Sequence, residues 1–288
     1  MALPQNVDEL GALLRSGHYL ADRGLATTVF LALKLGRPLL LEGEVGVGKT
    51  EIAKTLATVL DRELIRLQCY EGIDTHQALY EWDYARQMLQ IRAVSEGELT
   101  GSVGSLYAPE FLIERPLLSA VRSGDRAVLL IDEVDRADDE FEAFLLELLS
   151  DFQITIPEIG TIAAERPPLV ILTSNRTREL HDALKRRCLY HWVGYPTAER
   201  ELEIVMERQP QASQALADQV VAAVHRLRDL ELAKPPGVAE TIDWVETLDV
   251  LEVAQLDEQT AAETLSAVIK DPDDLELVHE ELTHIVVG

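Results

Sequence analysis

The segment that most constrains the fold of this chain is a glycine-rich run between a short apolar stretch and a stretch typical of a helix. The apolar residues 38–42 predict a buried parallel strand, and a helical pattern begins at residue 51. The run between them fits G-x-x-x-x-G-K-[ST] and consists of Gly43, Glu44, Val45, Gly46, Val47, Gly48, Lys49 and Thr50. In such a unit the loop N–H groups and the helix N-terminus create an anion site. We therefore predict a nucleotide-phosphate loop, in which Lys49 reaches the β- and γ-phosphates and Thr50 offers its hydroxyl to Mg²⁺.

A second apolar strand ends in two acidic residues. Residues 127–131 are too apolar for a strand with a solvated face, and Asp132 and Glu133 follow directly. Ligands of open α/β sheets bind outside the carboxyl ends of the strands, so both acids are expected at the site. Asp132 is predicted to hold Mg²⁺, directly or through water, and Glu133 to polarise an attacking water. The adjacent acids favour hydrolysis over phosphate transfer to a small molecule.

Two further segments carry polar residues next to predicted strands. The apolar run 169–174 ends at Asn175, which is placed to reach the γ-phosphate or the attacking water. Arg186 and Arg187 directly precede the strand predicted at 189–193. Paired arginines at this position are either functional or a solvated basic turn, and the residues alone leave both interpretations open.

The order of the elements indicates an α/β fold with a parallel sheet covered on both faces. Strands are predicted near residues 39–41, 64–67, 128–131, 170–173 and 189–193, with helices between them, including one at 25–35 ended by Gly36. After Thr197, a helix-capping residue, the pattern is mostly helical, with helices predicted at 216–227, 242–251 and 260–269. We therefore expect a nucleotide-binding αβα core at residues 1–195 and a small α-helical lid at residues 196–288.

Two segments of the predicted core are expected to be insertions. The first spans about residues 70–106 and includes a polar, glycine-rich stretch at 95–105 that predicts a loop. It contains three aromatic residues, Tyr80, Trp82 and Tyr84. These side chains could hold a client protein or pack locally, and both interpretations stand. The second insertion, residues 152–163, alternates in polarity and contains a proline and a glycine, which predicts a β-hairpin.

The composition limits the classes of partner and compartment. With 51 acidic against 26 basic residues the net charge is −25, which disfavours binding to nucleic-acid phosphates. The acidic balance serves either solubility or the docking of a basic partner. Neither a signal peptide nor an apolar run long enough for a membrane span is apparent, so a cytoplasmic location is expected. The two cysteines, Cys69 and Cys188, give no disulfide or zinc pattern and are expected to be free core thiols.

The four motifs, in this order, resemble the AAA+ ATPases, and most closely the MoxR family. Within that family the chain is similar to the branch associated with maturation of carbon monoxide dehydrogenase and related metalloenzymes. The segments that carry the resemblance are residues 40–50, 66–72, 80–84 and 172–176. The resemblance implies a P-loop AAA+ fold with a helical lid, and it identifies 152–163 as a pre-sensor-1 hairpin.

The resemblance also implies roles for single residues. Asn175 matches the sensor-1 position, and Arg187 matches the arginine finger that reaches the ATP of a neighbouring subunit, with Arg186 as the alternative. It implies a ring, expected to be a hexamer, a partner with a von Willebrand factor A domain, and an apo-metalloenzyme client. The chain departs from the AAA+ pattern at residues 234–241, where no arginine stands at the sensor-2 position.

Together these features predict an enzyme that hydrolyses ATP with Mg²⁺. The resemblance implies that it remodels a client protein so that a metal cofactor can be inserted or completed. Two other functions stay open. One is a nucleotide-gated, ring-forming binding module with little turnover, which the missing sensor-2 arginine motivates. The other is a nucleic-acid motor or clamp loader, because the same core serves those functions too, although the acidic charge disfavours it.

Overall fold

The computed structural model describes residues 3–95 and 106–287, so most of the glycine-rich stretch at 95–105 lies outside the described residues. The chain forms two compact units. The first contains the residues up to 17, residues 21–42 and residues 50–191. The second contains residues 18–20, residues 43–49 and the residues from 192 onward. Residues 43–49 of the predicted phosphate loop therefore belong to the second unit, while Thr50 and the acidic end of the 127–132 strand belong to the first.

The first unit is built on a five-stranded sheet with the strand order β2-β5-β8-β1-β9. The strands are β1 (Leu39–Gly43), β2 (Glu63–Gln68), β5 (Ala127–Asp132), β8 (Leu169–Ser174) and β9 (Leu189–Val193). β2 pairs with β5, β5 with β8, and β8 with β1, all in parallel. Every residue of β1, β5 and β8 is buried, as expected for strands covered on both faces. The predicted α/β fold and all five predicted strands are confirmed.

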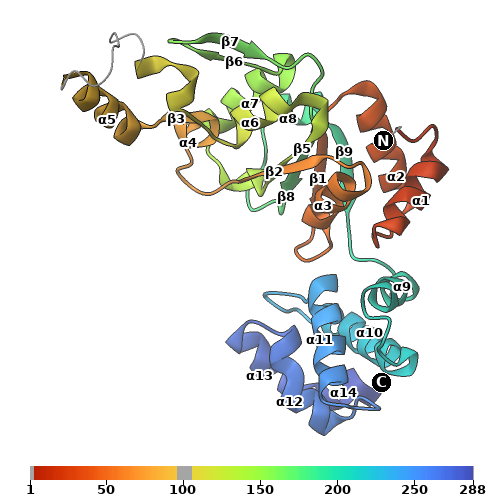
Figure 1. Ribbon diagram of the computed structural model, residues 1–288. Coiled ribbons are helices and arrows are strands. Elements are labelled where there is room, and N and C mark those ends of the chain that lie inside the picture. The colour runs from red at the N-terminus through yellow and green to blue at the C-terminus, as the bar shows by residue number, and fades with distance from the viewer. Residues whose placement is uncertain (1–2, 96–105, 288) are drawn as a thin grey trace. The chain divides into compact units, whose positions relative to one another are not determined.

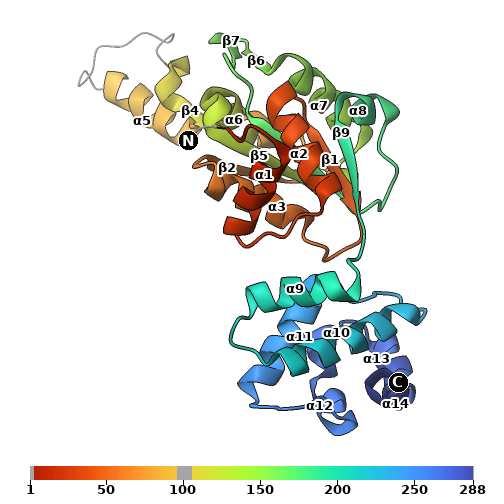
Figure 2. The ribbon, with the colours of Figure 1, turned by 90° about the vertical axis from the view of Figure 1, so that its right-hand side faces the viewer.

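Helices cover both faces of this sheet (Figures 1 and 2). One face carries α1 (Val7–Ser16), α2 (Arg23–Leu35) and α3 (Lys49–Val59). The other packs against α4 (Thr75–Leu79), α6 (Pro116–Ser123), α7 (Asp139–Asp151) and α8 (Asp182–Arg187). Successive side chains of a strand point to opposite faces, so the apolar strands supply both layers of the core. α2 ends at Gly36, whose φ of 63° places it in the left-handed region, as the sequence predicted.

Two small antiparallel sheets flank the main one. β3 (Tyr80–Trp82) pairs with β4 (Leu112–Glu114), and α5 (Tyr84–Ser95) follows β3 directly. β6 (Gln153–Ile156) pairs with β7 (Gly160–Ala163), which confirms the predicted hairpin. Two of the three aromatic residues of the first insertion differ in exposure, and local packing fits only the first of them. Trp82 is 8% exposed and joins the core, whereas Tyr84 is 65% exposed.

The second unit is helical. Its helices are α9 (Ala198–Arg208), α10 (Gln214–Asp229), α11 (Val238–Val250), α12 (Glu258–Val268), α13 (Pro272–Glu280) and α14 (Leu282–Val287). Their shared core includes the fully buried Trp244 of α11, and Thr197 caps α9. α11 begins at Val238, four residues before the predicted start, because Glu240 accepts a hydrogen bond from the Gly237 amide (2.9 Å) and caps the first turn. In the described parts of the chain, every helix is too short or too polar to cross a bilayer.

Candidate functional site

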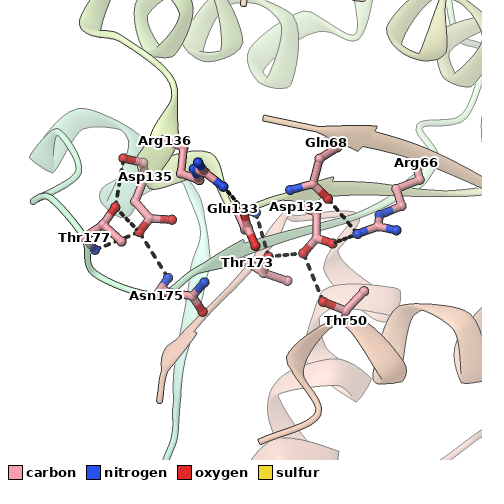
Figure 3. Close-up of polar contacts among 10 residues, drawn as sticks. All are labelled: Thr50, Arg66, Gln68, Asp132, Glu133, Asp135, Arg136, Thr173, Asn175 and Thr177. Atoms are coloured by element: carbon pink, nitrogen blue, oxygen red, sulfur yellow. Dashed lines mark hydrogen bonds and ion pairs between the residues drawn. The ribbon is translucent and has the colours of Figure 1, made fainter. Parts of the chain in front are cut away.

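The carboxylate of Asp132 is the centre of a polar cluster in the first unit (Figure 3). Asp132 ends the central strand β5 and is only 3% exposed. Its Oδ1 accepts hydrogen bonds from the hydroxyls of Thr50 (3.0 Å) and Thr173 (2.5 Å). Its Oδ2 accepts one from the Arg66 guanidinium (2.5 Å). The neighbouring strands β2 and β8 and the helix α3 thus each supply one partner, and the buried negative charge is compensated.

The donor set of this cluster fits magnesium. A threonine hydroxyl and a carboxylate are hard oxygen donors, and Mg²⁺ in proteins usually takes one or two such ligands and keeps several waters. Thr50 and Asp132, the two residues predicted to hold the metal, lie in direct contact although they are 82 positions apart. Their meeting supports the predicted metal role of both residues.

Arg66 was not predicted as a site residue. It lies on β2, and the same face of that strand carries Gln68, which pairs in register with Asp132. The Arg66 guanidinium also donates to the Gln68 side chain (2.6 Å). Arg66 and Gln68 alternate with the apolar Ile65 and Leu67, and this alternation was the available signal, because residues two apart point to the same face.

Glu133 stands in a backbone conformation that few side chains adopt. Its φ of 54° and ψ of 49° lie in the left-handed region. Its backbone N–H donates to the Thr173 hydroxyl (2.9 Å), and its carboxylate pairs with the Arg136 guanidinium at 3.0 Å. Thr173 therefore bonds both acids at once, donating to Asp132 and accepting from Glu133. Strained conformations of this kind persist where surrounding contacts fix them, often at functional sites.

Asn175 is positioned through its backbone by Asp135, which was not among the predicted site residues. The Oδ2 atom of Asp135 accepts hydrogen bonds from the Asn175 amide (3.2 Å), the Thr177 amide (2.8 Å) and the Thr177 hydroxyl (2.8 Å). Asp135 is 2% exposed, and its Oδ1 has no hydrogen-bond partner among the described residues. The end of β8 is thereby tied to the 3₁₀ turn η4 (Val134–Arg136) that follows β5.

The acidic cluster also affects a thiol. Cys69 follows β2, is buried and free, and its N–H donates to the Asp132 carbonyl (2.9 Å). Burial, and then the negative charges of Asp132, Asp135 and Glu133, raise the pKa of this thiol to about 12. Cys188 is likewise buried and free, so the prediction of two free core thiols is confirmed.

The glycine-rich loop has the shape that its motif demands. Gly46 (φ 74°) and Gly48 (φ 88°) occupy the left-handed region, which glycine adopts without steric cost. A Cβ on Gly43 would lie 1.9 Å from the Val193 carbonyl oxygen. Lys49 is 6% exposed, and its Nζ donates to the carbonyls of Gly43 (2.8 Å) and Glu44 (2.5 Å). A loop with glycines in the left-handed conformation and a lysine folded back over it is the arrangement expected for binding phosphate.

The outer side of this loop contacts the N-terminus of α11. The backbone amides of Val238 and Ala239 donate to the Gly46 carbonyl at 3.0 and 3.3 Å. Gly237 approaches so closely that a Cβ on it would lie 2.6 Å from the Gly46 Cα. This is the stretch in which the expected sensor-2 arginine is missing, and here backbone amides rather than an arginine meet the loop. This contact joins backbone atoms and was not predicted.

Arg186 and Arg187 lie at the end of α8, and both are exposed. The Arg187 guanidinium donates to the Leu146 carbonyl on α7 (3.2 Å). The backbone carbonyls of both arginines accept from the Arg37 guanidinium at 3.1 Å. Within the described residues, no hydrogen bond or ion pair joins either arginine to the Asp132 cluster.

Comparison with known proteins identifies the family. Residues 38–188, just over half of the chain, match the model of the AAA domain, dynein-related subfamily. The uncharacterized protein SH1500 of Staphylococcus haemolyticus is 23% identical over 225 residues, which cover 76% of this chain and 78% of SH1500. The uncharacterized protein YehL of Escherichia coli is 29% identical over 188 residues, which cover 62% of this chain and 47% of YehL.

Among solved structures, the RuvB Holliday junction branch migration motor of Thermotoga maritima aligns with a TM-score of 0.51 and 16% identity. The alignment covers 99% of this chain and 80% of RuvB, and at this identity the likeness is one of fold. The residues matched by the family model include the glycine loop and the acidic end of β5. The chain therefore belongs to the AAA domain family, in its dynein-related subfamily.

Proposed function

We propose that this protein binds ATP with Mg²⁺ and hydrolyses it by in-line attack of water on the γ-phosphate. The observation that carries the proposal is the contact between the Thr50 hydroxyl and the buried Asp132 carboxylate (3.0 Å). It brings the end of the phosphate-loop motif to the acidic end of β5, where a metal ligand is needed. Mg²⁺, when bound, neutralises charge on the phosphate oxygens.

Each predicted residue has a role in this proposal. Lys49 and the amides of residues 43–48 bind the phosphates, and Thr50 and Asp132 hold the metal. Glu133 accepts a hydrogen bond from the attacking water and polarises it, which requires its carboxylate to leave Arg136. Asn175 orients that water or the γ-phosphate, from a backbone position that Asp135 fixes.

We further propose that hydrolysis is completed between subunits. Arg187 would enter the ATP site of a neighbouring copy in a ring, expected to be a hexamer, with Arg186 as the alternative. The exposure of both side chains on α8 supports this role, because an arginine finger must reach out of its own subunit. In this proposal the nucleotide-binding core ends near residue 195, and residues 196–288 act as its lid.

The finer proposal places the chain in the MoxR family as a chaperone-like ATPase for metalloenzyme maturation. It rests on the sequence resemblance, which also suggests a von Willebrand factor A domain partner and an apo-metalloenzyme client. Deleting the gene tests it: at least one metalloenzyme of the host should accumulate without its complete metal cofactor. Full maturation of every metalloenzyme in the deletion strain would refute this client class and leave the ATPase proposal standing.

A nucleotide-gated binding module is the second candidate. Two observations favour it: Glu133 is paired with Arg136, and Asp132 is paired with Arg66, so both acids are engaged by cations. A nucleic-acid motor stays the less favoured alternative, because the net charge of −25 opposes phosphate binding. The fold likeness to the RuvB motor is no evidence for the same activity in this chain, because the two sequences are only 16% identical.

The test is the ATPase rate per protomer as a function of protein concentration, with Mg²⁺ present. We expect a rate that rises steeply as the ring assembles. Glu133→Gln should lower the rate about 10²- to 10⁴-fold, whereas Glu147→Gln, at an exposed acid on α7, should leave it unchanged.

A mixing experiment then assigns the finger. Arg187→Ala protomers keep Glu133, and Glu133→Gln protomers keep Arg187, so a mixture of two inactive variants should regain part of the wild-type rate. If Arg186→Ala is inactive alone and recovers in the mixture, whereas Arg187→Ala is active alone, Arg186 is the finger. Absence of turnover at every concentration, with ATP bound, would overturn the hydrolase proposal in favour of the gated module.

A further inference from the structure

A groove on the first unit lies apart from the Asp132 cluster and has no role in the proposed hydrolysis. It has a volume of about 680 Å³ and lies beside β3 and the turn of the β6–β7 hairpin. Its lining consists of Gln77, Tyr80, Glu81, Trp82, Tyr84, Arg115 and Glu158. We call it the aromatic–acidic groove. Most of its lining residues come from the two insertions. Neither the main sheet nor the phosphate loop depends on these insertions.

Two of the three aromatic rings that line this groove, those of Tyr80 and Trp82, pack against each other. Trp82 packs edge-to-face with Tyr80 (centroids 6.3 Å apart, interplanar angle 77°) and with Tyr107 (5.3 Å, 83°). Such edge-to-face pairs are favourable and fix the ring orientations. Tyr84, at the first position of α5, is largely exposed. The groove thus combines packed aromatic rings with an exposed tyrosine.

The two acids of the groove differ in their partners. Glu81 pairs with Arg115. Glu158, in the turn between β6 and β7, is exposed and forms no ion pair among the described residues. Its charge is close enough that, after burial, it is the next largest cause of the raised pKa of Tyr80. Among the residues that the structure describes, the groove therefore holds one carboxylate without an ion-pair partner, beside two tyrosines.

We propose that the aromatic–acidic groove binds an arginine or lysine side chain in a basic segment of a partner protein. Glu158 would pair with the cation, and the negative face of the exposed Tyr84 ring would attract it by cation–π interaction. The overall charge of −25 adds a long-range attraction for a basic partner and repels acidic peptides and nucleic acids. The inference rests on the proposed function in that the partner would be a client or an adaptor of the ATPase.

The test is a binding titration of labelled twelve-residue glycine–serine peptides that contain four arginines, four lysines or four glutamates. It uses the full chain without nucleotide, and then the Glu133→Gln variant, so that failure of the ATPase proposal leaves the result unaffected. We expect the arginine and lysine peptides to bind and the glutamate peptide to bind at least tenfold more weakly.

Two charge-matched variants separate the groove from the general surface charge. Glu158→Gln removes the groove carboxylate, and Glu165→Gln removes one exposed acid beyond β7. We expect the first to weaken arginine-peptide binding about fivefold and the second less than twofold, as exposed pairs contribute little. Tyr84→Ala should weaken it about two- to fivefold. Thermal melting of each variant checks that the chain remains folded.

Three results would overturn the proposal. One is no detectable binding of the basic peptides to the wild-type chain. Another is an equal loss in the two glutamine variants, which would show that only bulk charge attracts the peptides. The third is unchanged binding in both Glu158→Gln and Tyr84→Ala, which would place the peptides elsewhere on the surface.

Discussion

Replacing Gly237 by alanine tests whether α11 holds the glycine loop in shape. The backbone at Gly237 (φ −85°, ψ −175°) is extended and open to any residue, so the substitution adds no conformational strain. The new Cβ would lie 2.6 Å from the Gly46 Cα and 2.8 Å from the Val45 carbonyl oxygen. Carbon atoms make favourable contacts at about 3.5–4.0 Å, so the loop and the helix end must separate.

The size of the effect follows from the bonds that this separation breaks. The Gly46 carbonyl accepts two hydrogen bonds, from the amides of Val238 and Ala239. At about 0.5–1.5 kcal/mol each, their loss removes about 1–3 kcal/mol of support for the loop. If that support maintains the shape that binds phosphate, Gly237→Ala should weaken ATP binding about 5- to 150-fold, since about 1.4 kcal/mol corresponds to a factor of ten.

The assay is titration with a fluorescent ATP analogue, with thermal melting in parallel. The control is Gly11→Ala in α1, where a Cβ would meet nothing within 4 Å. It should leave the affinity unchanged and raise stability by about 0.5–1 kcal/mol. An affinity of Gly237→Ala within twofold of wild type, in a folded protein, would refute the reasoning. Tighter binding would mean that α11 hinders the nucleotide instead of supporting its loop.

Three further predictions concern a positioning residue, a buried ion pair and a thiol. Asp135→Asn should lower kcat for ATP hydrolysis about tenfold while ATP affinity stays within twofold, because the Asn175 backbone loses its charged acceptor; equal losses in kcat and affinity would indicate general unfolding. Glu201→Gln should lower the free energy of unfolding, measured with urea, by about 3–5 kcal/mol, because it leaves the buried Arg228 without its counter-charge. Burial raises the pKa of the Cys188 thiol from 9.0 to about 12. As pH rises, the thiol of the unfolded chain loses its proton before that of the folded chain. The free energy of unfolding of wild type, relative to that of Cys188→Ala, should therefore fall by about 1.4 kcal/mol per pH unit between these two pKa values. A difference independent of pH would contradict the shift.

The sequence predicted best where a role is encoded by neighbouring residues. The glycine loop with Lys49 and Thr50, and the two acids after β5, follow from contiguous motifs on strands that the apolar pattern reveals. Arg66 and Asp135 were missed because their importance depends on which strand ends are adjacent. A one-dimensional pattern gives no strand order, and here β5 lies between β2 and β8.

The start of α11 was misplaced for a related reason. The helical periodicity becomes clear only after residue 242, whereas the helix begins at Val238 because Glu240 caps it. Its contact with the glycine loop joins backbone atoms only and leaves no side-chain signature. The aromatic residues of the first insertion show the same limit, since nothing in the sequence distinguishes the buried Trp82 from the exposed Tyr84.

The backbone contact between α11 and the glycine loop has a consequence for how sequences of this kind can diverge. Its donors are the amides of Val238 and Ala239, which every residue except proline retains. Mutational drift at these two positions would therefore leave the contact intact. Gly237 and Gly46 are restricted, because a Cβ on Gly237 would lie 2.6 Å from the Gly46 Cα and a Cβ on Gly46 would lie 2.9 Å from the Gly237 Cα. Two relatives could therefore keep this backbone contact after their sequences in the region had lost detectable similarity.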